Sequence, residues 1–182
     1  MEDTTTLREA RATDADALGA LWRAFLDEQS AFDERVAPAK DALDRWQNDF
    51  PVWLDDPAYQ WVVAVRDGDL CGFVAAHRWA PPPIYRTVPE VYLTELYVRP
   101  SARRNGIARR LVHAVRDWAT DGDAVRVRLQ VLSANADAQD FWNTLGAEPL
   151  SETYTIACTP SPRENVTNPT DRNSFGFTWN KP

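Results

Sequence analysis

Cysteine and histidine are scarce in this chain of 182 residues, and their scarcity removes a class of site. The two cysteines, Cys71 and Cys158, form no CxxC motif, and the two histidines, His77 and His113, have no metal-binding spacing. A metal site would need Asp and Glu ligands in a pattern that the sequence does not show. We therefore expect no metal centre.

Long apolar runs are also missing. No segment approaches the roughly 18 consecutive apolar residues that a membrane-spanning helix needs. The opening residues, MEDTTTLREA, lack the apolar stretch of a signal peptide. We expect a cytoplasmic protein that has no membrane partner.

Positive charge is in deficit as well. The formal net charge of -7 argues against general binding to nucleic acid or to an anionic membrane surface. The positive charge is nearly all arginine, because Lys40 and Lys181 are the only lysines. Arginine is the better planar clamp for phosphate, although for most of these arginines the base composition of the genome is the preferred explanation.

What remains has the composition of one globular domain. Apolar residues make up 44% and charged residues 26% of the chain, which is enough to build a core at this length. We expect one domain over residues 1–158. A polar, proline-containing tail over 159–182 follows, either mobile or docked through its aromatic residues.

Hydrophobic periodicity predicts the element order β-α-α-β-β-β-α-β-α-β. The resulting fold class is a mixed α/β fold with a mostly antiparallel sheet of six to seven strands and about four helices. A hairpin is expected over 60–79 with its turn at Asp67-Gly68, and Pro51 is expected to end or kink the second helix. The predicted helices cover 13–28, 37–50, 106–122 and 134–146, and the other predicted strands cover 6–10, 91–98, 124–132 and 151–158.

Residues 96–115, LYVRPSARRNGIARRLVHAV, hold the clearest candidate site. A strand ends at Pro100, a basic turn follows, and a helix then begins. A helix N-terminus has unpaired amide donors and attracts anions, and Gly106 gives a ligand room to approach the backbone. With Arg103, Arg104 and Arg109 around it, this turn predicts a site for a pyrophosphate or another doubly charged anion, and the plainer interpretation is a solvated basic turn.

This stretch resembles the coenzyme A loop of the GNAT N-acetyltransferase superfamily. The motif Arg/Gln-x-x-Gly-x-Gly/Ala matches residues 103–108, LYVRP before it resembles the family's fourth strand, and NADAQDFWNTLG resembles a later family segment. The resemblance covers roughly residues 5–157. It implies a GNAT-like acyl-CoA N-acyltransferase fold and acetyl-CoA as cosubstrate.

The resemblance also implies a division of labour within the cofactor site. The backbone of the fourth strand would pair with the pantetheine arm, and the amides of 104–109 would hold the pyrophosphate. Asn135 would touch the arm where two parallel strands separate, although it also suits a helix N-cap. The cofactor-binding candidates are Leu96, Tyr97, Val98, Arg103, Arg104, Asn105, Gly106, Ile107, Ala108, Arg109, Asn135 and Trp142.

Glu95, in the middle of this strand, is the candidate general base, and an ordinary exposed or salt-bridged glutamate is the equal alternative. Glu90 is the second choice. Many relatives use a tyrosine as acid where this chain has Trp142, and an indole is no practical acid. Tyr154 and Tyr97 are the substitutes that the sequence offers, and solvent is another.

The acceptor is open at this point. Aromatic residues (Trp22, Trp46, Trp53, Trp79, Tyr85) and acidic residues (Asp27, Glu28, Asp33, Glu34) occur in the region where the family builds its acceptor site. They suit a cationic amine, and they also suit plain amphipathic helices. The leading hypothesis is an N-acetyltransferase acting on a small-molecule or peptide amine, with a possible homodimer. The alternatives are a non-catalytic acyl-CoA-binding module and a phosphate-binding domain of another family.

Overall fold

The fold is built on a five-stranded sheet whose spatial order follows the order of the chain. The structure, a computed structural model, describes residues 5–82, 84 and 88–158. Strands β1 to β4 are antiparallel neighbours, and β5 runs parallel to β4. The strands are β1 (Thr6–Glu9), β2 (Tyr59–Arg66), β3 (Asp69–Trp79), β4 (Glu90–Val98) and β5 (Arg126–Arg128).

The chain falls into two compact units, Met1–Ala147 and Glu148–Pro182. Every helix and strand of the described residues belongs to the first unit, and residues 148–158 of the second unit form neither. The helices are α1 (Ala15–Phe32), α2 (Ala42–Asp55), α3 (Ile107–Asp121) and α4 (Ala136–Thr144), with short 3-10 turns η1 (Ala12–Asp14), η2 (Glu34–Val36) and η3 (Pro100–Ala102).

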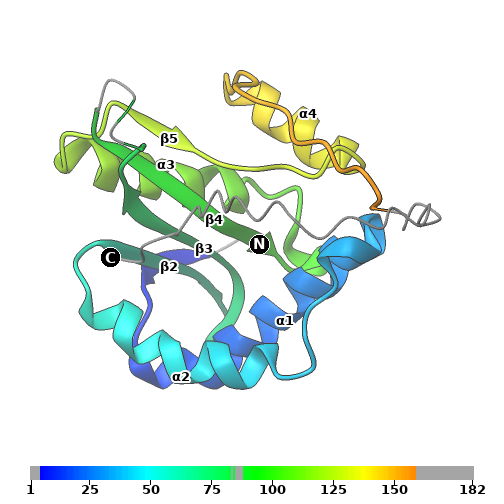
Figure 1. Cartoon of the computed structure of the whole chain (residues 1–182). Coiled ribbons are helices and arrows are strands. Elements are labelled where there is room, and N and C mark those ends of the chain that lie inside the picture. Colours follow the sequence, from blue (N-terminus) through cyan, green and yellow to red (C-terminus); the bar gives the residue numbers. More distant parts are fainter. Residues whose placement is uncertain (1–4, 83, 85–87, 159–182) are drawn as a thin grey trace, which may run out of the picture. The chain divides into compact units, whose positions relative to one another are not determined.

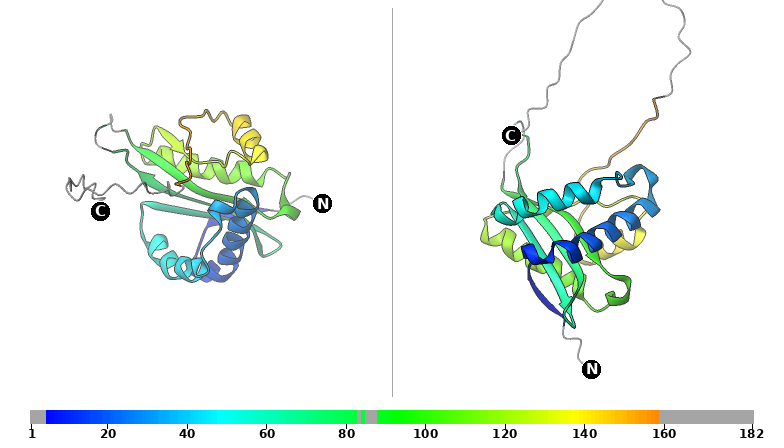
Figure 2. Two further views of the ribbon diagram at one scale, coloured as in Figure 1. Left: turned by 45° about the vertical axis from the view of Figure 1, so that its right-hand side comes forward. Right: turned by 90° about the horizontal axis from the view of Figure 1, so that it is seen from below.

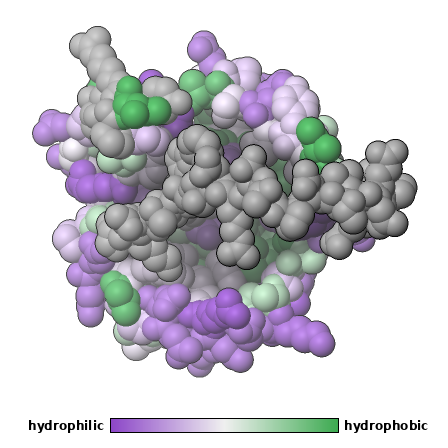
Figure 3. All heavy atoms as spheres, viewed as in Figure 1, coloured by the Kyte–Doolittle hydropathy of each residue, from purple (hydrophilic) through white to green (hydrophobic). Residues whose placement is uncertain are grey.

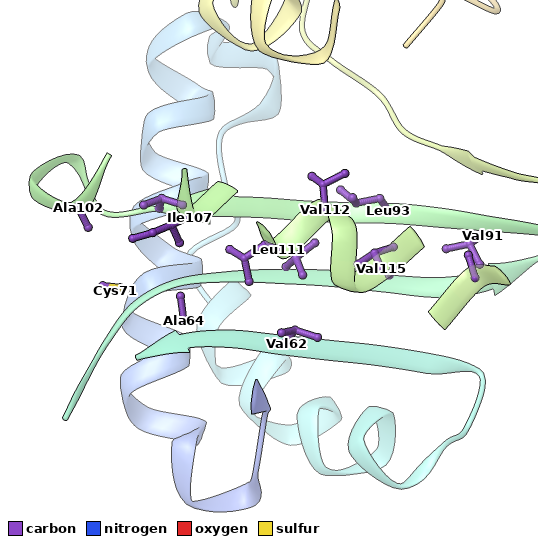
Figure 4. Packing of buried hydrophobic residues seen from close by; sticks show 14 residues of the cluster. Val62, Ala64, Cys71, Val91, Leu93, Ala102, Ile107, Leu111, Val112 and Val115 are labelled. Carbon is purple, nitrogen blue, oxygen red and sulfur yellow. The ribbon is translucent and has the colours of Figure 1, made fainter. Parts of the chain in front are cut away.

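Helices cover both faces of the sheet (Figures 1 and 2). Helix α3 packs Leu111 and Val115 against Val62 and Val91 of the strands, and Figure 4 shows these side chains meeting. Helices α1 and α2 cover the other face around Leu18 and an aromatic cluster. The aromatic cluster consists of Trp22, Trp46, Phe50, Trp53, Trp61 and Phe73.

The sequence predicted helix α2 correctly, but not its two ends. Trp46 and Phe50 are buried, whereas most of its other side chains are exposed, and Figure 3 shows mostly hydrophilic residues over α2 at the bottom of the view. The helix begins at Ala42, not next to Pro38, and it continues through Pro51 to Asp55. Of the two outcomes expected at Pro51, an end to the helix is therefore wrong, because burial of the apolar face outweighs one lost backbone hydrogen bond. A kink at Pro51 stays a prediction.

The predicted hairpin and the mixed, mostly antiparallel sheet are confirmed. Asp67 and Gly68 both have positive φ (54° and 89°), which is the backbone of a type I′ turn between β2 and β3. The strand count is lower than predicted, because residues 151–158 are not a strand, and β5 is shorter than predicted, at three residues. The predicted tail over 159–182 lies outside the described residues.

The described residues contain neither a membrane-spanning helix nor a cluster of metal-ligating side chains. Within them, no helix is long and apolar enough to cross a membrane. The same residues contain no group of three or more His, Cys, Asp or Glu side chains that could hold a metal ion.

Candidate active site

The site lies where β5 leaves β4. The two strands pair only from Glu90 opposite Arg126 to Tyr92 opposite Arg128, while β4 runs on to Val98. Among the described residues, no strand pairs with the far half of β4 on that side, and Figure 1 shows the two strands separating. An open strand edge therefore faces the space between β4 and residues 129–131.

Alternation along β4 determines which peptide groups face this open edge. The amide of Arg99 donates to the carbonyl of Cys71 on β3 at 2.8 Å. In an antiparallel ladder the pairs alternate, so Leu96 and Val98 turn their N–H and C=O groups away from β3. The peptide groups of Tyr97 face β3 by the same rule. Of the three residues expected to bind the pantetheine arm, Leu96 and Val98 are the two with suitable backbone groups.

The turn between β4 and α3 presents a row of unpaired amides. Arg104 and Gly106 both have left-handed backbones, with φ of 65° and 73°, and α3 starts directly afterwards. The first helical bond runs from the amide of Arg110 to the carbonyl of Gly106 at 3.1 Å. In the described part of the chain, the amides of residues 104–109 donate to no protein group. They form a positively polarised concave surface of the kind that binds phosphate.

Gly106 keeps this surface open. A Cβ built at this position meets nothing within 4 Å, so the space next to the backbone is free. The left-handed φ also makes any other residue strained here. The sequence predicted that this glycine leaves space for a ligand next to the backbone and that it permits a positive φ. Its geometry agrees with both.

A pocket of about 660 Å³ joins the turn to the open edge of β4. Its walls come from α1, β4, the turn, the start of α3, residues 129–131 and α4. Of the twelve predicted cofactor residues, all except Asn105 line it: Leu96, Tyr97, Val98, Arg103, Arg104, Gly106, Ile107, Ala108, Arg109, Asn135 and Trp142. Asn105 instead donates from its amide group to the carbonyls of Ala102 and Arg103 at 3.3 and 3.2 Å, which braces the turn.

Asn135 and Trp142 shape the α4 wall. The Asn135 side-chain oxygen accepts a hydrogen bond from the amide of Ala138 at 3.0 Å, so the predicted N-cap is confirmed. The residue is also buried and borders the pocket. Trp142 packs against the α3-side core and stacks edge-on with Phe141, with ring centroids 5.1 Å apart. It is both a core residue and a pocket wall.

A β-bulge places Glu95. Glu95 lies opposite Ala75, and Leu93 lies opposite Ala76, so Thr94 is an extra residue on β4. Leu93 and Tyr97 would share a face in a regular strand, but Leu93 packs on the α3 side and Tyr97 on the α1 side. Glu95, two residues before Tyr97, thus faces the α1 side.

The carboxyl of Glu95 is largely shielded from water. Burial raises the pKa of the Glu95 carboxyl above its ordinary value, and the Thr94 hydroxyl, which donates a hydrogen bond to it, and the nearby Trp22 indole lower this pKa in part. The Trp22 Nε1 atom is buried and, within the described residues, does not reach hydrogen-bond geometry with any partner. Glu95 is not in the pocket lining, whereas its neighbours Thr94 and Leu96 are.

A model of the acetyltransferase (GNAT) family matches residues 20–147, which is more than half of the chain. The chain belongs to this family. Bovine (Bos taurus) thialysine N-epsilon-acetyltransferase is 37% identical over 62 residues, which are 34% of this chain and 36% of that protein. The chain thus matches only about a third of the length of this curated relative.

Solved structures of low identity share the fold. A mutant of the BH1408 protein from Bacillus halodurans has a TM-score of 0.75 and 18% identity, covering 85% of this chain and 99% of its own. Aminoglycoside N-acetyltransferase AAC(6')-Iy, solved in complex with CoA, has a TM-score of 0.70 and 20% identity, covering 86% of this chain and 96% of its own. The GNAT-like fold expected from the sequence is confirmed.

The second-choice base, Glu90, has a different environment from Glu95. It is 2% exposed at the start of β4, and its carboxylate pairs with Arg126 and Arg128 on β5. It does not border the pocket. Glu90 therefore holds the paired half of the two parallel strands together.

The aromatic residues proposed for an acceptor site belong mainly to the core. Trp46 stacks on Trp22 and Phe50, with ring centroids 5.6 and 4.6 Å apart. Trp79 lies under the guanidinium of Arg128 at 4.6 Å. None of the four proposed tryptophans lines the pocket, and Tyr85 lies outside the described residues.

The α1 wall was only partly found from the sequence. Of the four acidic residues singled out, Glu28 borders the pocket, whereas Asp27 and Asp33 pair with Arg23 and Arg35. Phe25, Gln29 and Phe32 of α1 also border it. The helical spacing of Phe25, Glu28, Gln29 and Phe32 was the available signal, since residues three and four apart share a helix face.

Tyr154 belongs to the second unit. It is exposed, lies outside any strand and donates a hydrogen bond to Glu152. Its assignment as a catalytic acid stays a prediction.

Proposed function

We propose that this protein is an acetyl-CoA-dependent N-acetyltransferase that moves an acetyl group to a primary amine of a small molecule or peptide by direct attack. The observation that carries the proposal is the row of unpaired amides at 104–109, which opens into the pocket. Family membership and the similarity to a CoA-bound fold support it.

The cofactor would bind along the pocket in two parts. The amides of 104–109 and the guanidinium groups of Arg104 and Arg109 would hold the pyrophosphate. The open N–H and C=O groups of Leu96 and the N–H of Val98 would pair with the amides of the pantetheine arm, as an added strand does, because the Val98 carbonyl already accepts from Arg103. Coenzyme A would supply the activated thioester, and no metal is needed for this chemistry.

The acceptor must lose a proton before it attacks. An alkylammonium with a pKa of about 10.4 is neutral roughly once in 2500 molecules at pH 7, which costs about 4.6 kcal/mol. Glu95 would offset part of this cost as general base. Because Glu95 lies outside the pocket lining and Thr94 within it, the proton would pass through a water next to Thr94.

In the acetyl transfer the amine nitrogen bonds to the thioester carbonyl carbon, and the carbon–sulfur bond then breaks. A backbone N–H on the open edge of β4 would stabilise the oxyanion in between. The leaving thiolate takes up a proton, which is a modest demand at a thiol pKa of about 8.5. Tyr97 and Tyr154 are the candidate donors in the chain, and solvent is the third.

The test is a thiol-release assay with acetyl-CoA across four amine classes: polyamines, aminoglycosides, lysine-like side-chain amines and peptide amino ends. Mass spectrometry of each product should show a gain of one acetyl group for at least one class. Coenzyme A should also raise the melting temperature more than ADP does. Equal protection by ADP would favour a phosphate-binding domain without coenzyme A specificity.

The second candidate function is a non-catalytic acyl-CoA-binding module. The observation that favours it is Trp142, which stands where many relatives have a tyrosine that serves as the acid and which is partly buried against the core. Tight acetyl-CoA binding with no thiol release for any of the four classes would support this candidate. The homodimer and the cytoplasmic location stay predictions.

A further inference from the structure

Arg103 differs from the other two arginines of the turn, because its side chain is already occupied. Its Nη2 atom donates to both carboxylate oxygens of Glu28 on α1, at 2.8 and 2.7 Å. Its Nε atom donates to the carbonyl of Val98 at 2.8 Å. The guanidinium also lies over the ring of Tyr97, with 5.6 Å from Cζ to the ring centroid.

Glu28 also binds Tyr97. Besides the two hydrogen bonds from Arg103, its carboxylate accepts one from the hydroxyl of Tyr97 at 3.2 Å. Burial, and then the neighbouring Glu28 carboxylate, raise the pKa of the Tyr97 hydroxyl, which keeps the donor protonated. Helix α1, the end of β4 and the turn therefore meet in one hydrogen-bonded group, which we name the corner cluster: Glu28, Tyr97, Val98 and Arg103.

The position of the corner cluster is informative, because it stands at the end of the open edge of β4. The carbonyl of Val98 is one of the edge groups that alternation leaves free of β3, and Arg103 takes it. The amide of Arg103 is also used, since it donates to the carbonyl of Pro100 at 3.3 Å. In contrast, the side chains of Arg104 and Arg109 border the pocket and, among the described residues, have no hydrogen-bond or ion-pair partner.

We propose that Arg103 is a positioning residue and not a phosphate ligand: it joins the α1 wall of the pocket to the end of β4 and so sets the geometry of the acceptor side. This inference rests on the proposed acetyl transfer. It replaces the expectation from the motif, in which all three arginines surround the pyrophosphate. Arg104 and Arg109 supply the charge for the phosphates, and Arg103 orients Glu28 and the α1 side chains Phe25, Gln29 and Phe32 next to the thioester.

The test compares Arg103→Gln, Glu28→Gln and their double variant with Arg104→Gln as the matched control. Coenzyme A affinity is measured by calorimetry, and steady-state kinetics are measured with the best amine at saturating acetyl-CoA. We expect Arg103→Gln and Glu28→Gln to lower kcat/KM for the amine by a similar factor of about ten. The reason is that a displaced α1 no longer orients the amine for attack. The double variant should be no worse than either single variant.

Coenzyme A affinity should distinguish the positioning role of Arg103 from the phosphate-binding role of Arg104. Arg103→Gln and Glu28→Gln should each change the Kd of coenzyme A by less than about threefold, whereas Arg104→Gln should weaken binding by about threefold to tenfold. Arg103→Lys keeps the charge but loses the planar fork, so it should not restore amine kinetics. The proposal is overturned if Arg103→Gln weakens coenzyme A as much as Arg104→Gln does while Glu28→Gln leaves amine kinetics unchanged.

A measurement without coenzyme A keeps the inference separate from the proposed function. Hydrogen exchange of the α1 amides over residues 25–32 should become faster by a similar factor in Arg103→Gln and Glu28→Gln, and not in Arg104→Gln. Unchanged exchange in both variants would refute the positioning role. Failure of the unsubstituted protein to bind coenzyme A would refute the proposed function instead.

Discussion

The carboxylate of Glu95 on β4 lies close to the buried indole of Trp22 on α1, on the side of the sheet away from α3. The bulge at Thr94 produces this relationship, because it turns Glu95 to the α1 face while Leu93 stays on the α3 face. The candidate base therefore faces the helix that lines the acceptor side of the pocket. Leu96 and Val98, next along the strand, turn their backbone groups to the open edge.

Glu95→Gln should lower kcat for acetyl transfer by about 10²–10⁴-fold, the usual contribution of a general base. A base must be ionised, and burial raises the pKa of Glu95, so activity should fall on acidification at a higher pH than for an ordinary glutamate. The measurement is the pH profile of kcat/KM with two amines of different pKa. The limb due to the amine moves with the substrate, and the limb due to Glu95 does not and should vanish in the variant.

Ionisation of Glu95 should lower the stability of the fold, although the same ionisation is needed for catalysis. A carboxyl whose folded pKa is raised binds more protons in the folded state, so its ionisation destabilises the fold as the pH rises through the unfolded value of about 4.5. Glu95→Gln removes this pH-dependent cost. Urea unfolding between pH 4 and 7 should show the variant gaining stability over the unsubstituted protein as the pH rises, and a constant difference would contradict the burial of this group.

Gly106→Glu should abolish coenzyme A binding in calorimetry, because it adds bulk and negative charge where the diphosphate is expected. Gly68→Glu is the matched control, since Gly68 also has a positive φ (89° against 73°) and open space around it but does not border the pocket. It should share the cost of backbone strain and keep coenzyme A affinity. Equal loss in both variants would point to misfolding and not to the site.

Glu90→Gln should destabilise the fold by about 1–3 kcal/mol without changing coenzyme A affinity, because it removes a buried charge from two arginines. Asp27→Asn breaks the exposed pair with Arg23 and should change the free energy of unfolding by less than about 1 kcal/mol. Urea denaturation of both variants makes the comparison. A catalytic loss in Glu90→Gln with unchanged stability would restore Glu90 as a candidate base.

The acid is tested by Tyr154→Phe and Tyr97→Phe. If Tyr154 donates the proton to the leaving thiolate, Tyr154→Phe should lower kcat by at least about tenfold and leave the KM for acetyl-CoA nearly unchanged. Tyr97→Phe removes a hydrogen bond to Glu28 and should act mainly on the KM of the amine. Full activity in both variants would assign the proton to solvent.

The sequence by itself determined the hairpin at Asp67-Gly68, the alternation of apolar residues that separates strand from helix, and the basic turn with unpaired amides before α3. These features depend on neighbouring residues: positive φ at glycine, a proline that stops a strand, and amides that no preceding residue can bond. The twelve cofactor candidates follow from the resemblance to the GNAT family, and eleven of them border one pocket.

Only the tertiary structure decided where strand pairing ends and which charges find partners. Residues 129–131 continue the alternation of a strand, yet they leave β4 and line the pocket, because alternation reports burial and not ladder hydrogen bonds. The bulge at Thr94 leaves no mark in the sequence. Arg103 and Glu28 are 75 residues apart in the chain, and packing of α1 against β4 alone brings the two charges together.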